Sequence, residues 1–124
     1  MTDGFENTNN FKTYRDLLVW QKSMCLINNI YSICGEMPKN EEFILAAQIK
    51  RAAISIPSNL SEGWARKSNK AFSNHIKIAF GSTHEVLTQL EIVNNLYNIN
   101  TEEITTNYIE ISKMLNGLLK KLSH

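Results

Sequence analysis

Apolar residues recur at alternating spacings of three and four in four separate segments of the chain. This spacing keeps apolar side chains on one face of an α-helix, whereas a half-buried strand would need strict alternation. The pattern therefore predicts four amphipathic helices. Their apolar positions are Leu17, Trp20, Met24, Ile27, Tyr31 and Cys34, then Leu45, Ile49, Ala52 and Ile56, then Phe72, Ile76, Ala79, Thr83, Val86, Leu90, Val93 and Tyr97, then Ile104, Tyr108, Ile111, Leu115, Leu118 and Leu122.

Capping and helix-breaking residues suggest where the first two helices begin and end. Thr13, followed three residues later by Asp16, resembles a capping box that opens the first helix. That helix should weaken near Gly35 and end before Pro38. Asn40 is a candidate cap for the second helix, because the two glutamates after it suit a helix start.

Similar signals bound the last two helices. The second helix should end at Gly63, and Ser68 should cap a third helix that runs to about Tyr97. Thr101 opens the fourth. Connections this short make successive helices antiparallel neighbours. The predicted fold is all-α, an up-down-up-down four-helix bundle over residues 13–124, with residues 1–12 a flexible N-terminal segment.

Pro57 lies inside the second apolar segment. Proline lacks an N–H donor and clashes with the carbonyl four residues earlier, which predicts a kink near Ala53. Alternatively, the helix ends at Ile56 and a new one starts. The apolar register continues in phase to Asn59 and Gly63, which favours a single kinked helix.

Composition narrows the class of protein further. The chain has 124 residues, with 5 Gly and 2 Pro, too few for a sandwich or barrel of short strands. Its net charge of +1 excludes a globally basic nucleic-acid binder but leaves room for a local basic patch. The first residues are polar and acidic, unlike a secretory signal, and no stretch is apolar enough to span a membrane. We therefore expect a cytoplasmic protein.

Known catalytic and metal-binding patterns are not met. The His84-Glu85 pair would need a second histidine at position 88, which is Thr88, to form a zinc motif. No glutamate is followed three residues later by histidine, as di-iron bundles require. The five glycines are isolated, so no phosphate-binding loop is present. We expect no enzymatic activity, no metal, no cofactor and no small-molecule substrate.

Positive charge is concentrated in the middle of the sequence. Residues 43–84 contain six cations and one acid, a net charge of +5, while the rest of the chain carries −4. Within this stretch, residues 64–70 combine three cations with a tryptophan that we expect to be exposed near a helix start, a combination that can hold phosphates and stack on a base. An ordinary solvated loop is the alternative. The candidate nucleic-acid-binding residues are Lys50, Trp64, Arg66, Lys67, Lys70 and Lys77.

A polar row runs beside the apolar one on the second and third predicted helices. Such a row is a solvated face, a buried hydrogen-bond network or part of a subunit interface. In a network, Arg51 and Glu85 could form a charge pair. The candidate residues of a structural polar network are Arg51, Ser55, Asn59, Glu62, Ser82 and Glu85.

Four stretches carry a family resemblance: Leu17–Lys22, Gln48–Gly63, Ala79–Ser82 and Lys113–Leu118. They resemble the bacterial four-helix-bundle proteins encoded within intervening sequences of large-subunit ribosomal RNA genes, often labelled S23 ribosomal protein. The accessory protein of diversity-generating retroelements is similar in fold. The resemblance covers nearly the whole chain, and Gln48–Gly63 is its most specific part.

The resemblance implies a homopentamer of four-helix bundles with no catalytic residues, no cofactor and a link to RNA. It also favours a structural network for the polar rows, because these residues occupy positions of the family motif. The leading hypothesis is a non-enzymatic oligomer that binds structured RNA, or an RNA-associated protein, through the basic stretch. The alternative is a protein-interaction scaffold that binds no nucleic acid.

Overall fold

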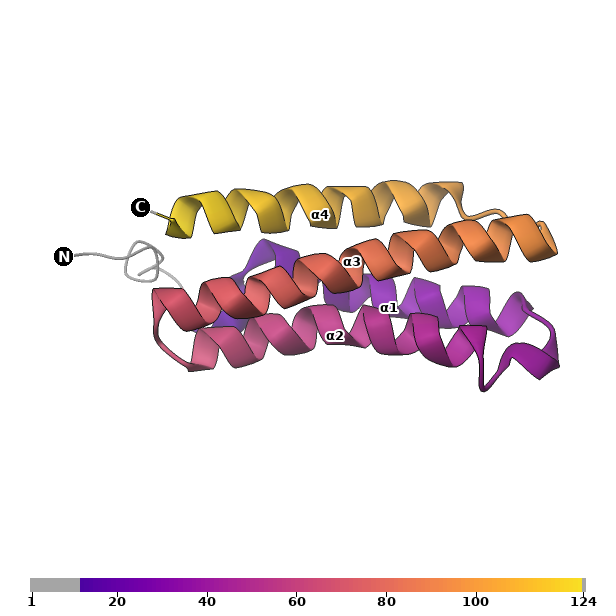
Figure 1. The fold of residues 1–124 in the computed structure, drawn as a ribbon, viewed down its shortest axis with the longest axis horizontal. Coiled ribbons are helices and arrows are strands. Elements are labelled where there is room, and N and C mark those ends of the chain that lie inside the picture. The colour runs from indigo at the N-terminus through magenta and orange to yellow at the C-terminus, as the bar shows by residue number, and fades with distance from the viewer. Residues whose placement is uncertain (1–11, 124) are drawn as a thin grey trace.

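The computed structural model describes residues 12–123, within which all regular structure is helical. The all-α prediction is therefore confirmed for the described residues, whereas the predicted flexible segment falls almost entirely outside them. In Figure 1 the ribbon reverses direction at each connection between long helices. The helices are α1 (Leu18–Glu36), α2 (Leu45–Ala65), α3 (Asn69–Tyr97) and α4 (Glu102–Leu122), with short 3₁₀ turns η2 (Tyr14–Asp16) and η3 (Lys39–Glu41).

The helices enclose one apolar core. α1 contacts α2 and α4, and α3 contacts the same two helices, which closes the bundle. The α2–α3 interface is the most extensive and the α1–α4 interface the least. Each large apolar side chain that the core buries completely contributes about 1.5–3 kcal/mol. Residues with no exposed surface include Ile30, Ile49, Ile56, Phe72, Ile76, Leu90, Tyr108 and Ile111.

The apolar seam of α1 differs from the predicted one. Val19, Leu26 and Ile30 face the core, whereas Met24 and Tyr31 from the predicted seam are exposed. Both sets of residues follow the same spacing of three and four, because α1 is apolar on two faces. The face of α1 that does not meet the core still packs partly against α2.

The first two helices begin later than predicted. Thr13 and Asp16 do form a capping box, but it caps the start of η2, and α1 starts only at Leu18. The expectation that Asn40 caps the second helix is wrong, because Asn40 lies within η3 and α2 follows Ile44.

Contacts of Glu41 account for this late start of α2. The Glu41 carboxylate accepts hydrogen bonds from the hydroxyl of Tyr97 on α3 and from the backbone N–H of Leu45, the latter at 3.4 Å. The connection after α1 is thereby held against the bundle as a short 3₁₀ turn.

α2 is continuous from Leu45 to Ala65 with Pro57 inside it, so the alternative of two separate helices is wrong. A bend near Ala53 stays a prediction. Ser68 caps α3 as expected, since its hydroxyl accepts a hydrogen bond from the N–H of Ala71. α3 ends at Tyr97, as predicted.

Candidate nucleic-acid interface

The turn between α2 and α3 presents three of the predicted cations. Arg66 caps the end of α2, and Lys67 follows with a positive φ of 53°, which lets the chain reverse before Ser68. The side chains of Arg66, Lys67 and Lys70 are all exposed. Lys77 is also exposed and lies seven residues after Lys70, on nearly the same face of α3. The structure therefore brings Arg66, Lys67 and Lys70 together at the turn, with Lys77 about two turns further along α3.

Trp64 does not join this surface. Its side chain is 8% exposed, and its ring meets the ring of Phe72 edge to face, with centroids 6.0 Å apart. Four residues after the fully buried Leu60, it lies on the core side of α2. The expectation of an exposed tryptophan is therefore wrong, and Trp64 cannot stack on a base while it occupies the core.

Lys50 is separated from the other predicted cations. It lies about 24 Å from Arg66 along α2, at the helical rise of 1.5 Å per residue. Its ammonium group stands 4.5 Å from the ring centroid of Tyr31 on α1. The basic stretch of the sequence is thus not one continuous surface.

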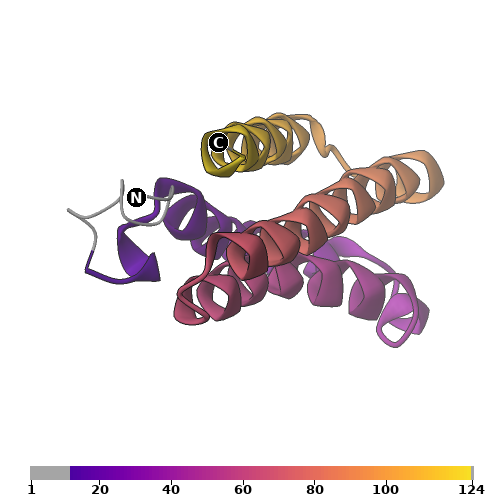
Figure 2. The ribbon, with the colours of Figure 1, turned by 60° about the vertical axis from the view of Figure 1, so that its left-hand side comes forward.

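The end of the bundle that carries the α2–α3 turn also gathers cations from the two ends of the chain. Figure 1 shows the start of α1 and the end of α4 at this end, and Figure 2 brings it forward. Sequence inspection missed these cations because they lie about fifty residues from the turn, although the predicted bundle topology already places them beside it. We call this surface the basic end; its cations are Lys12, Arg15, Arg66, Lys67, Lys70, Lys120 and Lys121.

The acids of the basic end are engaged with neighbours. Asp16 accepts hydrogen bonds from the backbone N–H groups of Lys12, at 2.6 Å, and Thr13. Glu62 pairs with Arg66, with Oε2 and Nη2 3.1 Å apart. The remaining cations at this end make no ion pair among the described residues. The surface is accordingly available to a polyanion.

The opposite end of the bundle is acidic. It consists of the connection from α1 to α2 and the connection from α3 to α4 (Figure 1). Positive and negative charge are therefore separated along the long axis of the bundle. The sequence showed this separation only in part, as a net charge of +5 in residues 43–84 and −4 in the rest of the chain. The charged residues of this end are six acids and three cations: Glu36, Lys39, Glu41, Glu42, Lys50, Arg51, Glu91, Glu102 and Glu103.

A hydrogen-bond network joins α2 to α3 where the polar rows predict it. The hydroxyls of Ser55 and Ser82 are 2.8 Å apart. The Asn59 amide donates to the carbonyl of Ser55, at 2.9 Å, and to its hydroxyl. On its other side, the Asn59 oxygen lies 3.0 Å from Nδ1 of His75. Since these groups are partly or fully buried, the bonds fix the register of the two helices.

The network continues to the basic end. Nε2 of His75 lies 3.8 Å from the carboxylate of Glu62, which also binds Arg66. His75 was not among the predicted members, although it shares a face of α3 with Ser82, seven residues away.

Two predicted members of the network lie outside it. Arg51 donates a hydrogen bond to Gln48 on its own helix, at 2.6 Å, and Glu85 is exposed. The described part of the chain shows no ion pair between Arg51 and Glu85. Arg51 instead binds the side-chain amide oxygen of Gln48, one turn earlier on the same helix.

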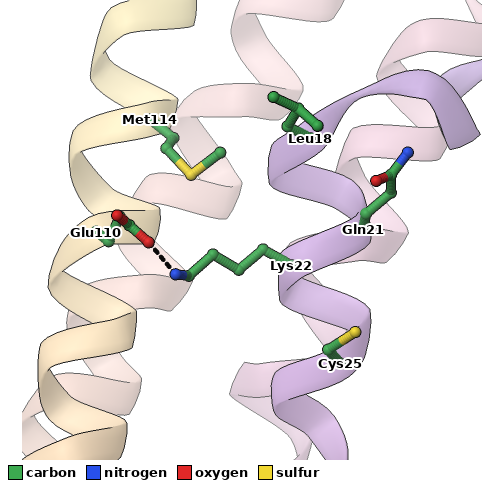
Figure 3. Close-up of a pocket in the computed structure, with 6 residues that line it drawn as sticks. All are labelled: Leu18, Gln21, Lys22, Cys25, Glu110 and Met114. Carbon is green, nitrogen blue, oxygen red and sulfur yellow. Dashed lines mark hydrogen bonds and ion pairs between the residues drawn. The ribbon is translucent and has the colours of Figure 1, made fainter.

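A hollow of about 490 Å³ opens between α1 and α4 (Figure 3). Lys22 of α1 reaches across it to the carboxylate of Glu110 on α4, while Leu18 and Met114 approach each other from the two helices. The ammonium group of Lys22 is already paired with Glu110, and most of the surface that lines the hollow is apolar. This site therefore suits an apolar partner better than a phosphate.

The described residues form neither a metal site nor a membrane-spanning helix. No group of His, Cys, Asp or Glu side chains among residues 12–123 is arranged to hold a metal ion. Within the same residues, no helix is both long enough and apolar enough to cross a bilayer.

Comparisons with known proteins agree with the helical architecture. A crystal structure of a protein of unknown function from the S23 ribosomal protein family of Bacteroides thetaiotaomicron VPI-5482 superposes with a TM-score of 0.76. The two sequences are 27% identical, over 83% of this chain and 99% of the other. None of the curated proteins matches the chain. The family described as 23S rRNA-intervening sequence protein matches residues 15–117. The chain belongs to this family of 23S rRNA-intervening sequence proteins.

Proposed function

We propose that the protein binds structured RNA through phosphate contacts at its basic end and catalyses no reaction. The observation that carries the proposal is the convergence of seven cations, from both chain ends and the α2–α3 turn, on one end of the bundle. Lys and Arg that neutralise phosphates release counterions, which supplies salt-dependent affinity for nucleic acid. The acidic opposite end repels the same polyanion.

The family description supports RNA as the polyanion, because it links the family to 23S ribosomal RNA. Because the net charge is only +1, RNA binding depends on where the charges lie on the surface. An RNA that touches the basic end meets a strongly positive surface even though the whole molecule is nearly neutral. The cytoplasm is the compartment in which we place this encounter.

We further propose that the protein assembles into a homopentamer, as the family resemblance implies. Exposed apolar residues on the outer faces, such as Ile78 and Ile92 on α3, offer surface for contacts between copies. In a ring of parallel copies the basic ends share one face. Each copy then adds phosphate contacts at high effective concentration, which strengthens binding without any new kind of contact.

The proposal is tested with charge reversal and salt. Electrophoretic mobility of a structured RNA is measured at two salt concentrations with the wild type, with Lys67→Glu/Lys70→Glu and with Lys39→Glu/Lys113→Glu. The control pair is also exposed and lies outside the basic end. We expect the first pair to weaken low-salt binding at least tenfold and to flatten the salt dependence. No binding at low salt, or equal losses from both pairs, would overturn the proposal.

A protein-interaction scaffold is the second candidate function, and the hollow between α1 and α4 favours it. Leu18 at its edge is 69% exposed, and Met114 lines the facing wall. A scaffold predicts that Leu18→Lys abolishes partner binding, whereas charge changes at the basic end have no effect. RNA binding that survives Leu18→Lys but not the reversal of Lys67 and Lys70 excludes the scaffold as the sole function.

A further inference from the structure

The second apolar face of α1 lines a hollow near the basic end. This hollow, of about 310 Å³, lies between the start of α1 and the C-terminal half of α2. Trp20 and Ile27 form the α1 wall, and Ile54 and Pro57 form the α2 wall. Tyr14, from η2, closes one side.

Two aromatic rings form one side of the hollow, and a cation stands over them. The rings of Tyr14 and Trp20 meet edge to face, with centroids 5.2 Å apart. The guanidinium of Arg15 stands 5.4 Å from the Tyr14 centroid and 5.8 Å from that of Trp20. Both rings are only partly buried, so each keeps open surface. Aromatic faces beside a guanidinium form the kind of surface on which nucleobases stack.

The aromatic side of the hollow is held in place by local hydrogen bonds. The Thr13 hydroxyl accepts from the N–H of Arg15 at 3.1 Å, and the Gln21 amide donates to the carbonyl of Arg15 at 2.7 Å. η2 also packs against α2. The rings and the guanidinium are therefore presented by backbone that is fixed to the bundle.

We propose that this hollow, which we call the aromatic pocket, binds one unpaired base of the RNA that the basic end holds. The base stacks on one of the two rings and meets the other at its edge, since the planes of Tyr14 and Trp20 are 67° apart. The flanking phosphates contact Arg15 and the cations of the α2–α3 turn. Hydroxyls of Ser58 and Ser61 on the α2 wall offer polar contacts to the base edge. This inference rests on the proposed function and refines it, because it selects RNA with a bulge or loop over a perfect duplex.

Charge complementarity decides between RNA and other occupants. Arg15 is exposed at the edge of the pocket, and Lys12 lies just before it in the chain. An apolar segment of another protein would fill the pocket without using these cations. A strand of RNA uses both, since it offers a flat base for the rings and a phosphate on either side.

The test compares two RNA hairpins that differ only by one bulged nucleotide, with wild type, Tyr14→Ala and Tyr31→Ala. Tyr31 is a matched control, because it is a partly exposed tyrosine of α1 with Lys50 over its ring. We expect wild type and Tyr31→Ala to bind the bulged hairpin about tenfold more tightly than the paired one. Tyr14→Ala should bind both hairpins equally.

Tryptophan fluorescence gives a second, direct measurement. Trp20 lines the pocket, whereas Trp64 is buried in the core, so a stacked base should quench only Trp20. We expect the bulged hairpin to quench the emission and the paired one to leave it unchanged. Adenosine monophosphate serves as a separate probe. Quenching by this nucleotide with no preference between the hairpins would assign the pocket to a free nucleotide and overturn the RNA-base assignment.

The remaining outcomes separate the two proposals. If both hairpins bind equally to wild type and Tyr14→Ala, the aromatic pocket is overturned while RNA binding by the basic end stands. If neither hairpin binds at low salt, the proposed function fails as well. A shift of Trp20 emission with protein concentration in the absence of RNA would show that a second copy covers the pocket, which also overturns the inference.

Discussion

A methyl group added at Gly63 of α2 would lie only 2.6 Å from the Cβ of His75 on α3. The same methyl group would lie 3.1 Å from the ring of Phe72, so neither neighbour leaves room for it. Gly63→Ala should therefore force α2 and α3 apart and destabilise the protein by about 1–3 kcal/mol. The midpoint of urea denaturation measures this change.

Gly117→Ala is the matched control for that substitution. Among the described residues, no atom apart from its chain neighbours and its own helix backbone lies within 4 Å of a Cβ added at Gly117, which is also helical. This variant should gain about 0.5–1 kcal/mol, because alanine favours helix over glycine. A similar gain at Gly63 would contradict the close approach of the two helices.

Asn59 is the central member of the polar network, and its removal should be costly. Asn59→Ala leaves Nδ1 of His75 and the hydroxyl of Ser55 with fewer partners in partly buried surroundings. We expect a loss of about 1–3 kcal/mol in the free energy of unfolding. Asn107→Ala is the control, since within residues 12–123 its amide bonds only the carbonyl of Glu103 on its own helix. It should change stability by less than about 0.5 kcal/mol, and equal effects of the two substitutions would rule out a stabilising network.

Tyr108 should make the protein sensitive to alkali. Burial raises the pKa of Tyr108 well above its ordinary value of 10.0. The unfolded chain therefore ionises first, and the stability present below pH 10.0 is lost as the pH rises above it. A weaker loss of the same sign comes from Tyr97, whose pKa is raised mainly by its hydrogen bond to Glu41.

Tyr108→Phe tests this alkaline effect. The Tyr108 hydroxyl is buried and has no hydrogen-bond partner among residues 12–123. Its removal should stabilise the protein by about 1 kcal/mol near neutral pH. Urea denaturation above and below pH 10 should also show a smaller alkaline loss in the variant. A variant that is less stable, or equally sensitive to alkali, would contradict this account.

Lys120 and Lys121 extend the proposed RNA surface to α4. Lys120→Gln/Lys121→Gln should weaken low-salt RNA binding and lower the slope of log affinity against log salt by about two, one for each phosphate contact. Lys39→Gln/Lys113→Gln, which removes two cations outside the basic end, should leave the slope unchanged. An unchanged slope in the first variant would restrict the RNA surface to the α2–α3 turn.

The sequence was most informative where a helix has a single apolar face. The seam positions predicted for α3 between Phe72 and Val93 are all buried, as their spacing of three and four predicts. α1 has two such faces, and spacing alone could not select the one that meets the core. The choice depends on which neighbours are available, and α2 and α4 take the face of Leu26 and Ile30.

In the candidate site, too, the sequence predicted some residues correctly and others wrongly, depending on whether tertiary packing sets their positions. Ser55, Asn59 and Ser82 form hydrogen bonds as the polar rows predict, because both rows lie beside the seam between α2 and α3. The sequence suggests Trp64 from the cations that follow it, and Arg51 from a possible charge pair with Glu85. Their positions depend instead on helix register, which carries Trp64 inward and turns Arg51 toward Gln48.

The separation of charge along the bundle also governs how the protein approaches its ligand. Antiparallel helices largely cancel one another's macrodipoles, so the side chains set the net electric moment of the molecule. That moment is parallel to the long axis and points toward the basic end. In the field of a polyanion it experiences a torque that rotates the basic end forward before any contact is made. Salt shortens the range of this torque to about 8 Å at physiological ionic strength, so orientation, and with it the association rate, falls as salt rises.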